Sequence, residues 1–121
     1  MIDLHCHILP AVDDGSRSLE ESLAMAETAI GDGIEILVAT PHMLNGVYRN
    51  TLETVQAGVS SLKTALADEG LPLHIRVGGD VHAVPGMVRA VEAGEAVTLN
   101  NGRKYLLMEL PSQFRVYADT E

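Results

Sequence analysis

The sequence predicts an α/β fold in which about four parallel strands carry helices on the outside. Apolar runs typical of buried strands alternate with segments whose apolar residues recur every three or four positions, in the order β-α-β-α-β-α-β. The run at residues 34–39 is rich in Ile and Val, as buried parallel strands are. No repeat, linker or low-complexity segment interrupts this order, so we expect a single domain over residues 1–121.

The first strand and the first helix are predicted from the opening of the chain. Residues 1–5 begin apolar and favour a strand. Ser18 and Glu21 have the spacing of a capping box, which indicates a helix start. Gly31 and Gly33 end the pattern that follows. The apolar residues at helical intervals are Leu19, Leu23, Ala26 and Ile30.

The second helix has the clearest periodicity in the chain. Asn50 followed by Glu53 predicts its start, and Gly70 and Pro72 end it. Its apolar positions are Leu52, Val55, Val59, Leu62 and Leu66. A third strand is expected at 73–77, a weaker helix at 84–92, and a fourth strand at 105–110 that Pro111 ends.

Composition excludes several classes of protein. The net charge of -9 argues against nucleic acid and against an anionic membrane surface as partners. No apolar run approaches the ~20 residues that a membrane span needs, so we expect no membrane insertion, and the N-terminus does not resemble a signal peptide. The one cysteine, Cys6, cannot form an internal disulfide, which favours a reducing cytoplasm.

Every predicted strand has a histidine or carboxylate near its carboxyl end, where parallel α/β folds collect their chemistry. The first strand runs into His5 and His7, the second into His42, the third into Asp80, and the fourth carries Glu109. A hydrophobic core requires none of these side chains. We therefore expect them to form one cluster although they lie far apart in the sequence.

The residue types in this cluster suit a metal centre. His5 and His7 point to one face of a strand with Cα atoms about 6–7 Å apart, so both imidazoles can bind one cation. Mixed imidazole and carboxylate ligands favour Zn, Mn or Fe over Ca. Two or three such ions would bind a phosphate and activate water. The carboxylates available are Asp13, Asp14, Asp80 and Glu109.

Each residue also has a simpler interpretation. A lone His-x-His is usually incidental, and His42 after Thr-Pro could only shape a turn. Asp13-Asp14-Gly15 is a good turn by itself, and Asp80 could cap the helix that follows it. Glu109 is the most telling, because a carboxylate within an apolar run needs a cation or a donor. Their joint occurrence at four strand ends favours a shared metal site.

Four segments resemble the bacterial tyrosine-protein phosphatases of the polymerase-and-histidinol-phosphatase (PHP) superfamily: MIDLHCHILPAVDDG, ATPHMLNGVYRN, VGGDVH and LNNGRKYLLMELP. These are manganese-dependent enzymes encoded with capsule and exopolysaccharide genes. The resemblance covers the whole chain. It implies a PHP-type domain, a distorted (β/α)7 TIM-like barrel with a multinuclear centre, usually of Mn2+, with Fe or Zn as alternatives. The implied substrate is the phosphotyrosine tail of a bacterial tyrosine kinase of polysaccharide synthesis.

The resemblance also implies roles for individual residues. The metal ligands would be His5, His7, Asp14, His42, Asp80 and Glu109. Asp14 and His42 would take part in catalysis, and Arg103 would bind the substrate phosphate. The chain departs from the family at two positions: Asp80 stands where Glu is usual, and Met43 stands where many members have a second histidine.

Members of that family are about twice as long, and their remaining ligands lie in the second half. The chain therefore resembles an N-terminal half, truncated at its C-terminus, which leaves a strand edge unpaired and allows an oligomer. Two alternatives stay open: a small-molecule phosphoesterase of the same superfamily, acting for example on histidinol phosphate, and an inactive, metal-binding remnant. A cysteine-phosphatase mechanism is rejected, because no Gly-rich phosphate loop follows Cys6.

Overall fold

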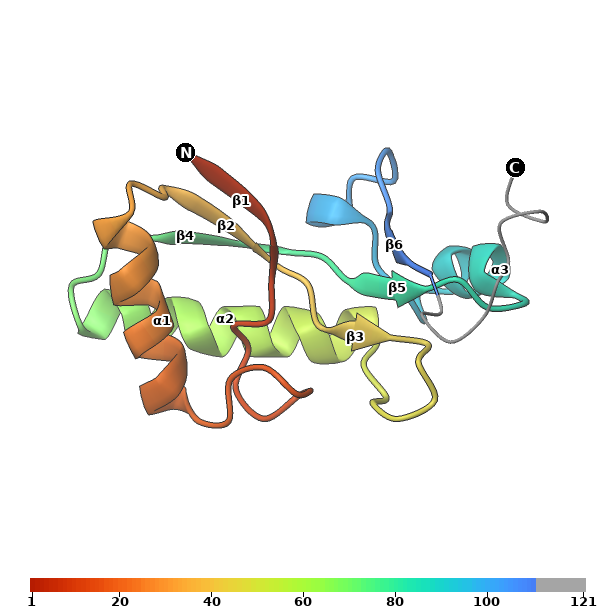
Figure 1. Ribbon diagram of the computed structural model, residues 1–121, viewed down its shortest axis with the longest axis horizontal. Coiled ribbons are helices and arrows are strands. Elements are labelled where there is room, and N and C mark those ends of the chain that lie inside the picture. The colour runs from red at the N-terminus through yellow and green to blue at the C-terminus, as the bar shows by residue number, and fades with distance from the viewer. Residues whose placement is uncertain (111–121) are drawn as a thin grey trace.

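The computed structural model describes residues 1–110 as a mixed α/β fold whose paired strands are all parallel, as predicted (Figure 1). The strands are β1 (Ile2–Cys6), β2 (Ile36–Ala39), β3 (His42–Met43), β4 (His74–Val77), β5 (Asp80–His82) and β6 (Leu107–Glu109). The helices are α1 (Leu19–Gly31), α2 (Leu52–Asp68), α3 (Met87–Glu92) and the 3-10 helix η1 (Leu99–Asn101).

The strands form two sheets, with the orders β1-β2-β4 and β3-β5-β6. This corrects the expectation of about four strands in one sheet. The chain leaves β2 and β4 and forms β3 and β5 a few residues later (Figure 1). The predicted strands at 34–39 and 73–77 therefore correspond to β2 and β4 alone, and β3 and β5 lie beyond their predicted ends. Strands of two or three residues are too short to show a periodicity of their own, which is why the sequence pattern missed them.

Gly78 lies where the chain passes from β4 to β5. A Cβ at this position would lie 2.6 Å from Cγ1 of Val38 and 3.2 Å from the carbonyl oxygen of Ala39. The two backbones can approach this closely only because residue 78 has no side chain. This close contact lies where the chain passes from the first sheet into the second.

Local capping sets the helix starts. The Ser18 side chain accepts a hydrogen bond from the Glu21 backbone N–H at 3.1 Å, which confirms the predicted start of α1. The start of α2 is a correction: its N-cap is Thr51, which forms a reciprocal capping box with Thr54. Asn50 lies one residue earlier and is buried.

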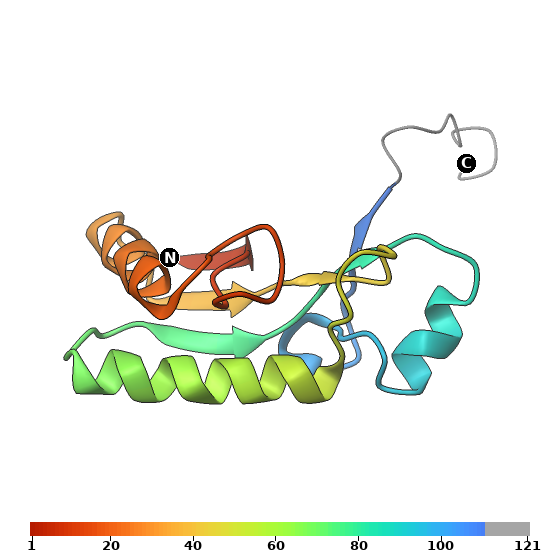
Figure 2. The same cartoon turned by 90° about the horizontal axis from the view of Figure 1, so that it is seen from below.

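The hydrophobic core lies between the sheets and helices α1 and α2. Figure 2 shows α2 running lengthwise beneath β4. The face of α2 predicted to be apolar is buried at Val55, Val59, Leu62 and Leu66. Full burial of one such side chain contributes about 1.5–3 kcal/mol, so this face holds α2 against β4. Leu19, the first residue of α1, is exposed, contrary to the predicted apolar face.

The remaining elements differ from expectation mainly at their ends. Helix α3 begins only at Met87, after Pro85 and the left-handed Gly86. Strand β6 is shorter than the predicted 105–110, and Tyr105 ahead of it is exposed. The predicted stop at Pro111 lies outside the described residues. Among residues 1–110, no helix has the length and apolar character that crossing a membrane requires.

Candidate metal centre

Metal-capable side chains from β1, β3, β5, β6 and the loop after β1 converge in one cluster. They form three overlapping groups within the described residues, and in each group the candidate ligand atoms lie within 4.8 Å of one another. The six ligands proposed from the sequence are all included. The full set is His5, His7, Asp13, Asp14, His42, Asp80, His82 and Glu109.

The first group joins the two histidines of the opening motif to Asp80. His5 lies on β1 and His7 directly follows that strand. Their Nε2 atoms are 3.2 Å apart, and Asp80 Oδ2 lies 3.6 Å from His5 Nε2 and 3.7 Å from His7 Nε2. Three ligand atoms thus face a common point. Asp80 is only 2% exposed, so its carboxylate is the most buried ligand of this group.

The second group is built around His42 and the loop after β1. His42 Nε2 lies 3.1 Å from Asp14 Oδ1. The rings of His42 and His7 have centroids 4.5 Å apart, so the two groups are in direct contact. Parallel pairing of β3 with β5 places His42 directly beside Asp80, and His42 Nδ1 lies 3.3 Å from Asp80 Oδ2. Strand register therefore brings together residues that are far apart in the sequence.

The third group contains His82, which sequence reasoning did not propose as a ligand. Parallel register pairs His82 of β5 with Glu109 of β6, and His82 Nε2 lies 3.0 Å from Glu109 Oε2. His42 Nδ1 lies 3.3 Å from the same oxygen. The signal was available: Asp80 and His82 are two positions apart, the same spacing as His5 and His7, and that spacing faces one side of a strand.

Hydrogen bonding sets the pKa values of the pair formed by His7 and Asp13. The bond between His7 Nδ1 and Asp13 Oδ2, 2.8 Å long, raises the pKa of His7 and outweighs the opposing effect of burial, and the charges of Asp13, Asp80 and Asp14 add to the rise. Burial acts to raise the pKa of Asp13, but bonds from His7, the Gly15 N–H and the His42 N–H outweigh it and lower that pKa. Asp13 is therefore held as a carboxylate.

Asp80 and Glu109 are close enough to affect one another. Burial raises the pKa of Asp80, and the neighbouring Glu109 adds to that rise. Burial acts to raise the pKa of Glu109 as well, but its bond with Asp80 and the nearby His42 and His82 lower it. Two carboxylates at one site cannot both ionise without cost, and a cation between them would remove that cost.

Two polar atoms in the cluster lie within ion-pair distance of their neighbours but form no hydrogen bond within the described residues. His42 Nδ1 and Glu109 Oε2 are inaccessible to solvent and form no hydrogen bond. Leaving such atoms unpaired costs about 1–3 kcal/mol each. A metal ion in the third group would satisfy both atoms. The donor set of imidazole nitrogens and carboxylate oxygens therefore fits Mn, Fe or Zn.

Arg103, predicted to bind phosphate, is not placed among these residues. It precedes the amino end of β6, whereas Glu109 is the last residue of that strand. Its side chain lines a hollow of about 310 Å³ with Val91, Thr98 and Leu106. Within residues 1–110 it forms no ion pair with the cluster carboxylates. The backbone at Arg103 has a φ of 59°, a left-handed conformation found in turns.

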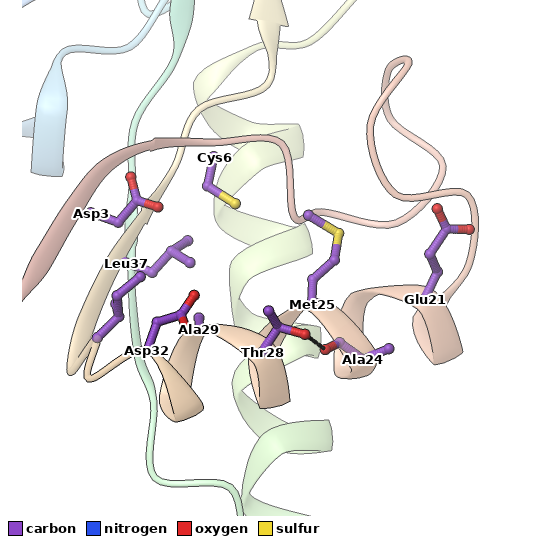
Figure 3. A pocket seen from close by; sticks show the side chains of 10 residues that line it. Asp3, Cys6, Glu21, Ala24, Met25, Thr28, Ala29, Asp32 and Leu37 are labelled. Carbon is purple, nitrogen blue, oxygen red and sulfur yellow. Dashed lines mark hydrogen bonds between the residues drawn. The ribbon is translucent and has the colours of Figure 1, made fainter.

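A larger hollow of about 420 Å³ lies between β1 and α1, and it contains none of the cluster residues (Figure 3). Cys6, Met25 and Leu37 line its apolar part. Burial raises the pKa of the Cys6 thiol to about 11, with Asp3 and Asp13 adding to the rise. A thiol with this pKa is protonated at neutral pH and is a poor nucleophile, in agreement with the rejected cysteine mechanism.

The chain matches known proteins along almost its whole length. The family described as "Capsular polysaccharide synthesis, CpsB/CapC" matches residues 1–118. The tyrosine-protein phosphatase YwqE of Bacillus subtilis is 39% identical over 111 residues, which are 92% of this chain and 43% of that protein. The tyrosine-protein phosphatase CpsB of Streptococcus agalactiae is 33% identical over 113 residues, 93% of this chain and 46% of that protein.

The fold agrees with a solved structure. A chain described under "Crystal structures of YwqE from Bacillus subtilis and CpsB from Streptococcus pneumoniae, unique metal-dependent tyrosine phosphatases" superposes with a TM-score of 0.90 at 37% identity. The match covers 99% of this chain and 49% of that one. The chain thus spans less than half the length of the curated relatives it matches.

Proposed function

Because this chain belongs to the CpsB/CapC family of capsular polysaccharide synthesis, we propose that it forms part of a metal-dependent protein-tyrosine phosphatase. The observation that carries the proposal is the sharing of residues between the three metal-capable groups. His7 belongs to two groups and His42 to two, so ions bound in them would be neighbours. Neighbouring ions are the arrangement that phosphate-ester hydrolysis uses.

The proposed ligands follow the three groups. His5, His7 and Asp80 would hold one ion, Asp14 would bind a second, and Glu109 with His42 and His82 would hold a third. We propose Mn2+ as the natural metal, with Fe and Zn as alternatives, because mixed nitrogen and oxygen ligands accept all three. When bound, the ions would activate water for in-line attack on phosphorus and offset the charge on the phosphoryl oxygens.

The protein's own side chains would orient the ester. The side chain of Asp14 is 66% exposed, so it reaches the open side of the cluster, where a phosphate would enter. The ring of Tyr48 lies nearly parallel to that of His42, with an interplanar angle of 16° and centroids 6.1 Å apart. This aromatic side chain beside the centre supports a substrate with an aromatic ring. Asp14 and His42 are the proposed catalytic residues; a phosphate contact by Arg103 stays a prediction.

We propose that the substrate is the phosphotyrosine tail of a bacterial tyrosine kinase. We also propose that the protein acts in the cytoplasm, where Cys6 stays reduced. The curated relatives are named tyrosine-protein phosphatases, which supports this class over histidinol phosphate. We further propose that the two sheets belong to a distorted (β/α)7 barrel of PHP type, of which residues 1–121 supply one part. Parallel pairing throughout and helices on the outside support this architecture.

The test is hydrolysis of a phosphotyrosine peptide by the full-length protein, with and without added Mn2+. We expect activity with metal, loss after chelation, and restoration by Mn2+ in preference to Zn2+. His7→Ala should lower metal affinity by more than about 100-fold, beyond the effect of a residue that only orients a ligand. His74→Ala is the matched control, because His74 is an exposed histidine on β4 outside the cluster. Full activity after rigorous chelation would overturn the metal mechanism.

Two further measurements separate the alternatives. Faster turnover of histidinol phosphate than of the phosphotyrosine peptide would assign a small-molecule substrate. The alternative of an inactive, metal-binding remnant is tested with residues 1–121 produced alone. Metal binding without hydrolysis by that segment supports this alternative. Hydrolysis that disappears in His7→Ala would exclude it.

A further inference from the structure

Asp13 is a buried carboxylate whose oxygens are both engaged. It lies in the loop after β1, and its side chain is 0% exposed. Oδ1 accepts a hydrogen bond from the Gly15 N–H at 2.9 Å. Oδ2 accepts from the His42 N–H at 3.0 Å and is bonded to His7 Nδ1 at 2.8 Å. One side chain thus joins three segments of the chain.

The bond to His7 determines which nitrogen of that ring faces the metal groups. A carboxylate can only accept, so the proton of a neutral His7 lies on Nδ1. The lone pair then lies on Nε2, the atom 3.2 Å from His5 Nε2 and 3.7 Å from Asp80 Oδ2. A metal ligand needs this lone pair, and an outer carboxylate that fixes the tautomer also strengthens the ligand.

The same carboxylate also holds the loop after β1 in contact with β3. Its bond to the His42 N–H places the loop so that Asp14 Oδ1 lies 3.1 Å from His42 Nε2. Asn50 reinforces the junction, because its Nδ2 donates to the carbonyls of Val12 at 2.9 Å and His42 at 3.1 Å. At Gly15, a Cβ would clash with the His7 backbone, so the loop closes tightly over that residue.

We propose that Asp13 is a positioning residue and not a metal ligand: it fixes the tautomer and orientation of His7 and the placement of Asp14 beside His42. The proposal rests on the proposed metal-dependent function and deepens it. Asp13 lies within ligand distance of His7, Asp14 and His42. However, a cation on Oδ2 would have to displace two donors that the fold already supplies, and the buried side chain offers no other oxygen that is free.

The first test leaves Asp13 unchanged. Long-range proton–nitrogen NMR correlations of the metal-free full-length protein report the tautomer of each neutral histidine, and His7→Gln identifies the His7 signals. The expected result is a proton on Nδ1 of His7. A proton on Nε2 would overturn the proposal, because His7 could then not bind a metal through the atom that faces His5 and Asp80.

The second test is Asp13→Asn, which keeps the shape of the side chain. The carboxamide has one accepting oxygen, so its NH2 group must face one of the three N–H groups that Asp13 accepts from. If it faces Nδ1 of His7, the proton of His7 can move to Nε2. We expect a mixture of His7 tautomers and Mn2+ affinity about 10–100-fold weaker, with the number of ions bound at saturation unchanged. Asp68→Asn is the matched control, since Asp68 is an exposed carboxylate at the end of α2.

Loss of one bound ion at saturation with an unchanged His7 tautomer would overturn the proposal and make Asp13 a ligand. Affinity within about twofold of wild type would also overturn it. Neither readout uses a substrate. If the tautomer and affinity change as expected but the wild-type protein does not hydrolyse phosphotyrosine peptides, the proposed function fails and the role of Asp13 stands.

Discussion

At the scale of single residues, Asp80 has the most central position in the cluster. Its Oδ2 lies 3.3–3.7 Å from ring nitrogens of three histidines, His5, His7 and His42. It is also the position where the family resemblance leads us to expect a glutamate. A bound cation would stabilise a carboxylate that is buried among imidazoles.

Asp80→Asn should therefore weaken Mn2+ binding by at least about 100-fold, because it removes the carboxylate charge of the group that Asp80 forms with His5 and His7. Calorimetric titration of the metal-free full-length protein measures this. Asp80→Glu is the control that retains the charge and lengthens the side chain by one methylene. Equal losses in both variants would mean that geometry, and not charge, is what the site requires.

The pair formed by Asp13 and His7 makes the stability of the metal-free protein depend on pH. The raised pKa of His7 stabilises the fold below its ordinary value of 6.5, and this contribution is lost as the pH rises through the raised pKa. The lowered pKa of Asp13 stabilises the fold above its ordinary value of 3.8, and this contribution is lost as the pH falls through the lowered pKa. The pair contributes most between these two values.

Thermal unfolding in the presence of a chelator checks this dependence. Relative to His7→Gln, the wild-type protein should gain most in Tm between about pH 4 and pH 6.5 and lose the gain on both sides of that window. A difference in Tm that does not change with pH would show that the contact between Asp13 and His7 carries no charge. His74→Gln serves as the control.

At the scale of elements, α2 supports the cluster through its first turn. Thr51 caps the helix, and Asn50 immediately before it is bonded to Val12 and His42. The capping hydroxyl satisfies a backbone N–H that would otherwise lack a partner. The apolar face of the helix then packs against β4, from which the chain continues into β5 and Asp80.

Thr51→Ala should lower the free energy of unfolding by ~1 kcal/mol, the usual cost of losing such a cap. Chemical denaturation of the metal-free protein measures it. Thr64→Ala is a matched control on the same helix, because Thr64 is exposed and bonds only the Ser60 carbonyl one turn earlier; its effect should stay within about 0.5 kcal/mol. Equal losses of unfolding free energy in the two variants would show that the Thr51 cap does not stabilise the helix.

At the scale of the whole molecule, β1 is one of the two edge strands of its sheet within the described residues. Its apolar residues Ile2 and Leu4 are 58% and 54% exposed, and Met1 beside them is 70% exposed. An apolar edge strand is a surface on which another strand can pair. In a closed barrel this edge would be covered.

Residues 1–121 produced alone should therefore self-associate, whereas Ile2→Lys with Leu4→Lys should shift the same segment toward monomer. Light scattering coupled to size-exclusion chromatography measures both. Val47→Lys with Val88→Lys is the control, because both residues are exposed apolar positions away from β1. A wild-type segment that stays monomeric at high concentration would show that the edge is protected without a partner.

The sequence by itself determined the α/β class, the parallel pairing, the apolar face of α2 and the candidate ligands at the strand ends. These follow from local periodicity and from the rule that side chains two apart on a strand share a face. It also predicted that the polar residues would meet. It could not predict β3 and β5, whose few residues carry no periodic signal.

Only the tertiary structure decided which residues are neighbours within the cluster. Parallel register places His42 beside Asp80 and His82 beside Glu109, and a slip of one residue would turn each side chain to the other face. The loop closure at Gly15 brings Asp13 beneath His7 and His42, a contact that no local pattern encodes. Register and loop closure are set by the packing of the whole chain, because many weak contacts together choose one arrangement.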